Sequence, residues 1–227
     1  MLLHVRGGPT VIDLHTHSLM SDGELLPSEL VRRAVTIAYR AIAITDHTDH
    51  SNYDCIIPRI VSVCERLSAS YPIRALPGTE ITHVHPADIS DLAKEARSLG
   101  AQIIIVHGET IVEPVTPGTN HAALLADIDI LAHPGLITQE DAALAAERGI
   151  FLEVSARKGH SLTNGHVVSV ARRCGARLLL NTDSHSPDDL ITKEQARRIA
   201  EGAGMSSEEI DGMIRNAEVL SGIIDGS

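Results

Sequence analysis

Residues 11–23, VIDLHTHSLMSDG, begin as a short apolar strand and end with side chains of the kind that bind metal ions. His15 and His17 are two positions apart, so in an extended chain both point to the same face. Asp22 follows in the segment that leaves the strand. Imidazoles and a carboxylate at one strand exit are suitable ligands for divalent transition metals. The stretch therefore predicts a metal site at the end of a strand.

The rest of the chain alternates short β-branched runs with amphipathic stretches of helical length, which is typical of repeated βα units and a parallel sheet. No glycine-rich dinucleotide-binding turn follows the first strand, which weakens the case for an open nucleotide-binding sheet. We therefore expect an α/β barrel of seven βα units. The predicted strands are residues 11–15, 41–45, 73–82, 102–107, 130–132, 150–155 and 177–182. The predicted helices are residues 27–39, 56–69, 87–99, 139–148, 165–174, 193–201 and 206–217.

Length and composition favour one domain without a nucleic-acid or membrane partner. A chain of 227 residues, 43% hydrophobic, can bury a large core, and we expect a single domain over residues 1–227. The formal net charge of -11, with no cluster of Lys and Arg, argues against extended nucleic acid. The N-terminus lacks an apolar core of signal-peptide length, and the aliphatic run at 103–106 is too short to span a bilayer. A cytoplasmic location is expected.

Further residues of the metal-binding types fall at the ends of the predicted strands. The C-terminal ends of barrel strands converge on one face, so side chains placed there meet although they are far apart in sequence. Asp46 is adjacent to His47 and cannot also point inward, and we interpret Asp46 as a partner that orients a ligating imidazole. Glu153, near the end of the sixth strand, leads into the basic pair Arg157 and Lys158. The strand-end residues are His15, His17, His47, Glu80, His107, His133, Asp183 and His185.

Other candidates do not fit this placement. His83 and His85 repeat the His-x-His spacing, but the two-residue period of a continuing strand puts them opposite Glu80, so we interpret them as loop or surface residues. The cysteines are odd in number and lack a zinc-type spacing, which predicts reduced, buried thiols. They are Cys55, Cys64 and Cys174. The remaining histidines lie in predicted loops or helix starts and are interpreted as structural: His4, His50, His121, His160 and His166.

The motifs now described resemble those of the PHP (polymerase and histidinol phosphatase) family of metal-dependent phosphoesterases. The opening DLHTHSLMSDG is followed, in that family's order, by ITDH at 44–47, GTE at 78–80, VHG at 106–108, AHPG at 132–135 and NTDSH at 181–185. The match spans residues 13–185 and includes every strand-end ligand. The resemblance implies a distorted, TIM-like barrel of seven strands and two or three divalent ions of zinc, manganese or iron.

The resemblance also distributes the ligands among the ions. Some family members have His where this chain has Asp22, which leaves the metal preference of the third position open. The first ion would be held by His15, His17, Glu80 and Asp183. Glu80 would also bridge to a second ion at His107 and His133. The third ion would be held by Asp22, His47 and His185.

The chemistry implied is hydrolysis of a small phosphate monoester, histidinol phosphate being one substrate that the family suggests. A water molecule activated by the cations would attack phosphorus in line. Arg157 and Lys158 would add positive charge beside the equatorial phosphoryl oxygens, although an ordinary solvated basic pair explains them equally well. Glu80 and Asp183 complete the expected catalytic set through the ions that they hold.

Other functions remain open from the sequence. A nuclease or phosphodiesterase acting on short or cyclic nucleotides uses related chemistry. An amidohydrolase also opens with His-x-His, but no lysine ends a middle strand here, and the ending at Asp183 and His185 disfavours it. A non-catalytic barrel in a ribonucleoprotein assembly is expected to lose ligands that this chain keeps. Specificity is expected to lie in loops 109–121 and 156–164, the first being either a lid or a partner surface.

Overall fold

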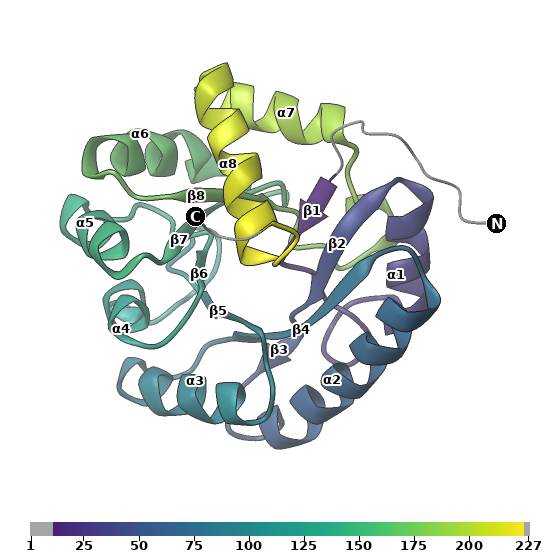
Figure 1. The fold of residues 1–227 in the computed structure, drawn as a ribbon. Helices are drawn as coiled ribbons and strands as arrows, with labels where there is room; N and C mark the ends of the chain where they lie inside the picture. Colours follow the sequence, from purple (N-terminus) through teal and green to yellow (C-terminus); the bar gives the residue numbers. More distant parts are fainter. Residues whose placement is uncertain (1–10, 225–227) are drawn as a thin grey trace.

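Seven parallel strands form a nearly closed barrel in the computed structural model, which describes residues 11–224, and helices surround the strands (Figure 1). The predicted α/β barrel is confirmed. Neighbouring strands pair in the order β1 (Val11–Asp13), β2 (Tyr39–Ile44), β4 (Arg74–Ile81), β5 (Ile103–His107), β6 (Ile130–Ala132), β7 (Phe151–Ser155) and β8 (Leu178–Asn181). A short strand that was not predicted, β3 (His47–Thr48), follows β2 and pairs with the later part of β4.

The helices lie outside the strands and match the predicted ones, with the addition of α4. Thr138 accepts a hydrogen bond from the backbone N–H of Asp141 at the start of α5, and Gly149 ends that helix with a φ of 70°. No helix among residues 11–224 is long and apolar enough to cross a membrane. The helices are α1 (Pro27–Thr36), α2 (Tyr53–Ser70), α3 (Ile89–Ser98), α4 (Thr119–Leu125), α5 (Gln139–Arg148), α6 (Asn164–Cys174), α7 (Lys193–Gly202) and α8 (Ser207–Leu220). Three 3-10 turns are η1 (Pro86–Asp88), η2 (His160–Thr163) and η3 (Pro187–Asp189).

Aliphatic side chains fill the interior of the barrel and close the end where the strands begin. Ala217 of α8 belongs to this interior cluster, and Leu220 and Ile223 pack against it. Phe151, the first residue of β7, is also a member, and the Arg177 guanidinium lies 4.1 Å from its ring centroid. Figure 1 shows α8 lying across this end of the barrel. The end is therefore a packed apolar layer.

The barrel is distorted where its first and last strands meet. Strand pairing there is reduced to an isolated bridge between Thr16 and Ser184. Beside it, the N–H of His17 donates to the carbonyl of Ser184 at 2.8 Å, and the N–H of Asp183 donates to the carbonyl of His15 at 2.9 Å. These bonds lie beyond the regular ends of β1 and β8. They set both histidines of the opening motif beside Asp183.

The cysteine environments correct one prediction. All three cysteines are free. Cys64 is buried in α2, and burial raises the pKa of its thiol to about 12. Cys55 is exposed and Cys174 is half-buried, so the prediction of buried thiols is wrong for Cys55. The reason is that Cys55 lies in the first turn of α2 on the side that faces solvent.

Candidate metal centre

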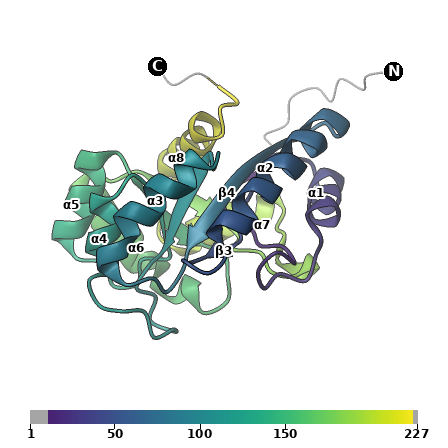
Figure 2. The same ribbon diagram turned by 90° about the horizontal axis from the view of Figure 1, so that it is seen from below.

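The C-terminal ends of the strands carry most of the polar residues that the sequence placed there. In Figure 2 the arrow of β4 points away from α8, toward the end of the barrel where the loops after the strands gather. His47 and His185 are half-buried at this end, and the side chain of Asp22 is 55% exposed. The buried members are His15, His17, Glu80, His107, His133 and Asp183.

Glu80 lies at the centre of a first group. Its Oε2 is 3.4 Å from Nε2 of His15 and 3.5 Å from Nε2 of His17. The Oδ1 atom of Asp183 is 3.7 Å and 3.2 Å from the same two nitrogens. Side chains from β4 and from the segments after β1 and β8 therefore converge on one position. These are the residues predicted to hold the first ion.

The other carboxylate oxygen of Glu80 faces a second group. Glu80 Oε1 lies 3.5 Å from Nε2 of His133, and the ring centroids of His133 and His107 are 4.5 Å apart. One carboxylate thus directs its two oxygens at different sets of imidazoles, which is the arrangement of a carboxylate that bridges two ions. The structure brings His107 and His133 together beside Glu80, as the sequence predicted.

A third group surrounds Asp22 at the more exposed side of the cluster. Its Oδ1 lies 3.6 Å from Nε2 of His47, and its Oδ2 lies 3.2 Å from Nε2 of His185. Nδ1 of His17 is 3.9 Å from Asp22 Oδ1. One ligand atom from each of these four residues lies within 4.8 Å of the others. The structure thus gathers the residues predicted for the third ion and adds His17 to them.

Several buried polar atoms of the cluster have no hydrogen-bond partner among the described residues. They include Nε2 of His15, both ring nitrogens of His17 and both carboxylate oxygens of Glu80. Buried nitrogens and oxygens without partners destabilise a fold unless another group satisfies them. Divalent cations do this with imidazole nitrogens and carboxylate oxygens at about 2.0–2.2 Å. The donor set therefore fits a metal centre.

Charges and burial within the cluster keep two of its acids ionised and one of its imidazoles neutral. Burial would raise the pKa of Glu80, but the charges of His15 and His47 outweigh it and hold that pKa well below its usual range. Burial is likewise outweighed at Asp22, where hydrogen bonding and imidazolium charges lower the pKa to about 2. Burial and the charge of His47 lower the pKa of His17 well below its usual range. Both acids are therefore ionised at neutral pH, and the His17 ring is neutral.

Two candidate ligands have a backbone conformation that L-residues rarely adopt. The φ angle is 26° at His133 and 52° at Asp183. Such strain persists only where the surroundings enforce it, and it is concentrated at functional sites. Two residues after His133, Gly135 has a φ of 61°, and a Cβ there would lie 1.9 Å from the carbonyl oxygen of Glu109. The strand exits are shaped to direct particular side chains into the cluster.

Glu153 supports the first group from within the barrel. Burial would raise its pKa, but the charge of His15 outweighs burial and lowers it, so the side chain is a carboxylate. Its Oε2 accepts a hydrogen bond from Nδ1 of His15 at 2.8 Å and another from Nδ2 of Asn181 at 2.9 Å. Because Nδ1 donates to Glu153, Nε2 is the nitrogen that the His15 ring presents to Glu80 and to a metal ion.

Asp46 does not have the predicted role of orienting an imidazole. Its carboxylate accepts hydrogen bonds from the N–H of Ser18 at 2.7 Å and from the hydroxyls of Ser18 and Ser21, both at 2.8 Å. The prediction is wrong because β2 ends at Ile44, and the side chain of Asp46 turns toward the segment that follows His17. Asp46 instead fixes the loop that carries Asp22.

His160, interpreted from the sequence as structural, lies inside the cluster. The residue is 4% exposed, and its ring stacks on the His133 ring with the centroids 4.1 Å apart. Its Nε2 is 3.6 Å from Oδ2 of Asp183. Burial, with the charge of His133, lowers the pKa of His160 to about 3. The residue lies at a helix start, as predicted, because the chain after β7 folds into η2. This turn directs the ring into the cluster, which was not predicted; its position after Arg157 was the one available signal.

Glu113 enters the site from loop 109–121 and was not predicted. Its Oε2 lies 2.9 Å from Nε2 of His107, and its Oε1 lies 3.5 Å from Nε2 of His160. The hydrogen bond from His107 lowers the pKa of Glu113 to about 2. No motif marks this residue, because its place depends on the path of the loop. The loop borders the site as far as α4, which begins at Thr119.

His83 is an exposed residue in the loop after β4, as predicted, and its ring lies at the edge of the site. A φ of 54° breaks the alternation of the preceding strand and brings its ring centroid to 5.1 Å from that of His107. His85 is a loop residue, as predicted, and its Nδ1 accepts from the N–H of Ala87. The remaining histidines include His50 and His121, both exposed, and His166, which hydrogen bonds to the carbonyl of Ile137; His4 lies outside the described residues.

The two basic residues after β7 differ in their placement. Nη1 of Arg157 donates to the carbonyl of Asp183 at 3.0 Å and lies 2.7 Å from Nδ1 of His185. Its Nε is 3.5 Å from Oδ2 of Asp183. Arg157 lines the hollow above the cluster together with His47, His83, His107, Glu113 and His160. Lys158 is exposed, and no hydrogen bond or ion pair joins it to residues 11–224.

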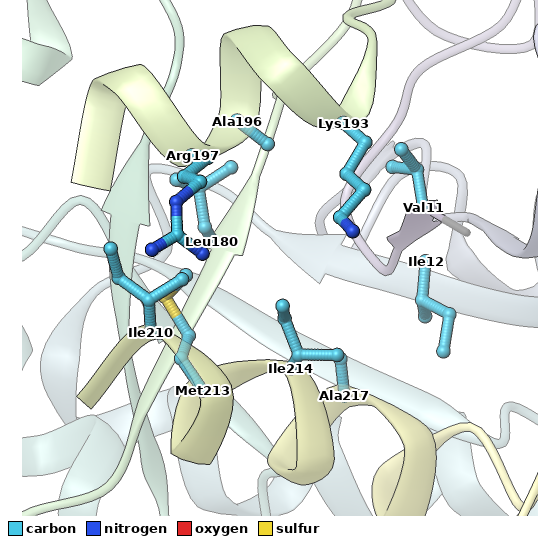
Figure 3. Close-up of a pocket in the computed structure, with 10 residues that line it drawn as sticks. All are labelled: Val11, Ile12, Leu180, Lys193, Ala196, Arg197, Ile210, Met213, Ile214 and Ala217. Atoms are coloured by element: carbon cyan, nitrogen blue, oxygen red, sulfur yellow. The ribbon is translucent and has the colours of Figure 1, made fainter. Parts of the chain in front are cut away.

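A second hollow lies away from the metal-binding side chains. It is bounded by β1, β8, α7 and α8, and Figure 3 shows its aliphatic side chains, with Lys193 and Arg197 on one wall. The residues that line it include no histidine, cysteine or acid. It therefore lacks the groups needed for metal-dependent chemistry, and the cluster at the strand ends is the candidate site.

Comparison with known proteins identifies the class to which this chain belongs. The profile of the PHP domain matches residues 13–127. MJ1295, an uncharacterized protein of Methanocaldococcus jannaschii, is 48% identical over 201 residues, which cover 88% of this chain and 92% of that protein. The chain belongs to the PHP family. The predicted class, a metal-dependent phosphoesterase that uses divalent ions, is the class of this family.

Two further relatives have described activities. The 5'-3' exoribonuclease Rnm of Escherichia coli is 28% identical over 170 residues, which are 73% of this chain but 49% of the exoribonuclease. This chain thus spans about half the length of that relative. A histidinol phosphate phosphatase of Lactococcus lactis, solved with zinc, L-histidinol and phosphate, superposes with a TM-score of 0.63 at 19% identity over 86% of this chain and 94% of that one. At this identity the likeness shows the fold alone.

Proposed function

We propose that the protein hydrolyses the phosphate monoester of a small molecule. The observation that carries this proposal is the group of nine predicted ligands at one end of the barrel, with the Arg157 guanidinium against Asp183 and His185. Divalent ions held there supply Lewis acidity and a water molecule activated as a nucleophile near neutral pH. The three ligand groups allow two or three ions, and the mixed imidazole and carboxylate donors suit zinc, manganese or iron.

Among residues 11–224, Arg157 is placed to recognise a phosphoryl group. Its guanidinium lies in the hollow, where it is partly buried, and a planar donor fork binds two phosphoryl oxygens at once. Positive charge held at a fixed position stabilises the charge that develops on the equatorial oxygens. Lys158 points to solvent, so we assign this role to Arg157 alone.

The charge of the whole chain supports a small substrate. A formal net charge of -11 disfavours a long phosphate backbone at a distance, whereas a single phosphoryl group is bound locally by cations and Arg157. The half-buried His47 and His185 leave the hollow open on the side of Asp22. Histidinol phosphate is one candidate, because the fold is shared with a phosphatase of that substrate.

The second candidate is a nuclease acting on short RNA. It is favoured by the identity of 28% with an exoribonuclease over most of this chain. Both activities use the same nucleophile and differ in whether the attacked phosphorus carries one ester bond or two. The two functions are therefore separated by substrate rather than by ligand set.

A panel of substrates tests the proposal. Metal-loaded protein is assayed against p-nitrophenyl phosphate, sugar phosphates, nucleoside monophosphates and histidinol phosphate, and against bis-p-nitrophenyl phosphate and a 5'-phosphorylated oligoribonucleotide. We expect the best monoester to exceed the best diester in kcat/KM by about tenfold or more. Faster turnover of the oligoribonucleotide would establish the nuclease instead. Absence of monoester hydrolysis by protein of full metal content refutes the phosphatase.

A matched pair of variants tests which basic residue binds the phosphoryl group. Arg157→Gln is expected to lower kcat/KM for the best monoester about 100-fold, because a fixed charge beside the phosphoryl oxygens is lost. Lys158→Gln, the adjacent basic residue, should leave kcat/KM nearly unchanged. The reverse result would return the role to Lys158.

A further inference from the structure

We propose that His160 is a further ligand of the metal position at His107 and His133, and that Thr110 fixes the orientation of its ring. The assignment rests on the metal centre of the proposed function. It adds to that position an imidazole from the loop after β7, which the sequence motifs did not predict. It also makes residues 110–113 part of the wall of the centre.

The three imidazoles are close enough to share one ion. One nitrogen from each of His107, His133 and His160 lies within 4.8 Å of the others, and all three residues are buried. Nitrogens bound to one tetrahedral zinc ion at about 2.0–2.1 Å lie about 3.4 Å apart. The nitrogens therefore need to approach one another by up to about 1.4 Å. Small rotations of the three side chains within their rotamer wells bring the nitrogens closer.

The hydrogen bond between His160 and Thr110 determines which nitrogen of His160 is free. Nδ1 of His160 lies 2.7 Å from Oγ1 of Thr110, and the backbone of Thr110 is itself held by a bond from its N–H to the carbonyl of Gly108 at 2.8 Å. A hydroxyl that accepts from Nδ1–H leaves the lone pair on Nε2. Nε2 is the nitrogen that faces Asp183 and Glu113, at 3.6 Å and 3.5 Å. A histidine ligand with its second nitrogen hydrogen-bonded is the usual arrangement in metal sites.

Glu113 shows on which side this position opens. Its carboxylate faces Nε2 of both His107 and His160, and its side chain is 37% exposed, whereas the side chain of His160 is 3% exposed. The imidazoles are therefore enclosed, and the carboxylate lies on the accessible side. Three enclosed nitrogen ligands with one side toward solvent are typical of a catalytic position rather than a closed structural one.

Metal binding by substituted proteins tests the assignment without reference to hydrolysis. His160→Phe keeps a planar ring against His133 but removes both nitrogens, and His160→Asp restores a ligand. Thr110→Val removes the hydroxyl at constant volume, and Thr110→Ser restores it. His166→Phe is the matched control, because that imidazole bonds to a backbone carbonyl outside the cluster. Each protein is freed of metal, checked for folding by circular dichroism, and titrated with zinc and with cobalt(II).

We expect His160→Phe to lose one equivalent of tightly bound zinc and to change the visible absorption of the cobalt protein, which reports coordination number. Thr110→Val should weaken one equivalent by about 10- to 100-fold, as loss of a hydrogen bond to a ligand does. His160→Asp, Thr110→Ser and His166→Phe should bind as the wild type does. An unchanged stoichiometry, affinity and cobalt spectrum in folded His160→Phe protein overturns the assignment.

The outcomes separate this inference from the proposed function. If wild-type protein binds metal and hydrolyses no phosphate ester, the proposed function fails, and the zinc titration of His160→Phe still decides the ligand. If wild-type protein hydrolyses a monoester and His160→Phe keeps all of its zinc, the inference fails alone. A wild type that binds neither zinc nor cobalt refutes both.

Discussion

The two ends of the barrel differ in the polarity of the side chains that fill them. Where the strands begin, Phe151 and the aliphatic residues of α8 form a closed layer with few polar atoms. Where the strands end, buried imidazoles and carboxylates include nitrogens and oxygens without partners among residues 11–224, and His133 and Asp183 have strained backbones. The first end is stabilised by burial of apolar surface, whereas the second contains polar atoms that bound cations would satisfy. The comparison indicates that the apolar end of the barrel stabilises the fold, whereas the polar end forms the candidate metal centre.

Among substitutions that distinguish the two ends, Glu80→Gln is expected to have the largest effect on activity. Glu80→Gln removes the charge of the carboxylate that faces both imidazole groups, so hydrolysis should fall by about 1,000-fold or more. In the metal-free protein the substitution also leaves the imidazoles that face Glu80 without their carboxylate, so the free energy of unfolding should fall by about 3–5 kcal/mol. Enzyme kinetics, metal content and urea unfolding after chelation measure these quantities. Glu29→Gln, an exposed acid of α1, is the control; full activity in Glu80→Gln would contradict the ligand assignment.

At the opposite end, Phe151→Ala should destabilise the protein without disturbing the centre. Deletion of this buried ring is expected to lower the free energy of unfolding by about 3–5 kcal/mol. Phe151→Leu keeps most of the volume and should cost less than about 1.5 kcal/mol. Folded Phe151→Ala protein should bind zinc with the wild-type stoichiometry. A loss of zinc at temperatures well below its unfolding transition would show that the two ends are coupled.

Substitution of Glu153 should have a smaller effect, a loss of metal affinity at the end of the barrel that carries the ligands. Glu153→Gln weakens the hydrogen bond to Nδ1 of His15, and the affinity of the first metal position should fall by about 10- to 100-fold. Asp46→Asn is the matched control, because Asp46 bonds to Ser18 and Ser21 and to no imidazole. Zinc titration compares the variants. Equal losses of affinity would mean that Glu153 acts only through general packing.

The smallest effect on stability is expected from removal of an ion pair at the end of the barrel where the strands begin. Arg97 donates to Asp129 at 2.9 Å, and the same carboxylate oxygen accepts from the N–H of Ile104 at 2.7 Å. Arg97→Ala should lower the free energy of unfolding at pH 7 by about 1 kcal/mol. Burial raises the pKa of Asp129, and loss of the guanidinium should raise it further.

The pH dependence of the stability of Arg97→Ala follows from the raised pKa of Asp129. A carboxyl whose pKa is raised by folding destabilises the folded state above that pKa, and the penalty disappears as the group is protonated in acid. The deficit of Arg97→Ala relative to wild type should therefore be largest at neutral pH and shrink below the folded pKa of Asp129. Urea unfolding at several pH values checks this. A deficit that grows in acid would contradict the ion-pair interpretation. Arg66→Ala serves as a control, because Arg66 is exposed and forms no ion pair with residues 11–224.

The sequence by itself determined the barrel and most of the cluster. The local periodicity of apolar residues predicts the strands and helices. A parallel barrel brings the C-terminal ends of its strands to one face. Residues placed at those exits, such as His15, Glu80 and Asp183, were therefore predictable from position alone. Their two-residue spacing also fixed which neighbours share a face.

Only the tertiary structure decided what the loops contribute. His160 and Glu113 reach the cluster through η2 and loop 109–121, whose paths depend on contacts between segments far apart in sequence. His83, an exposed loop residue, borders the site because of a single positive φ, and Asp46 turns away because β2 ends earlier than predicted. Periodicity describes regular backbone, and it carries no information about side-chain direction once the backbone leaves a regular conformation.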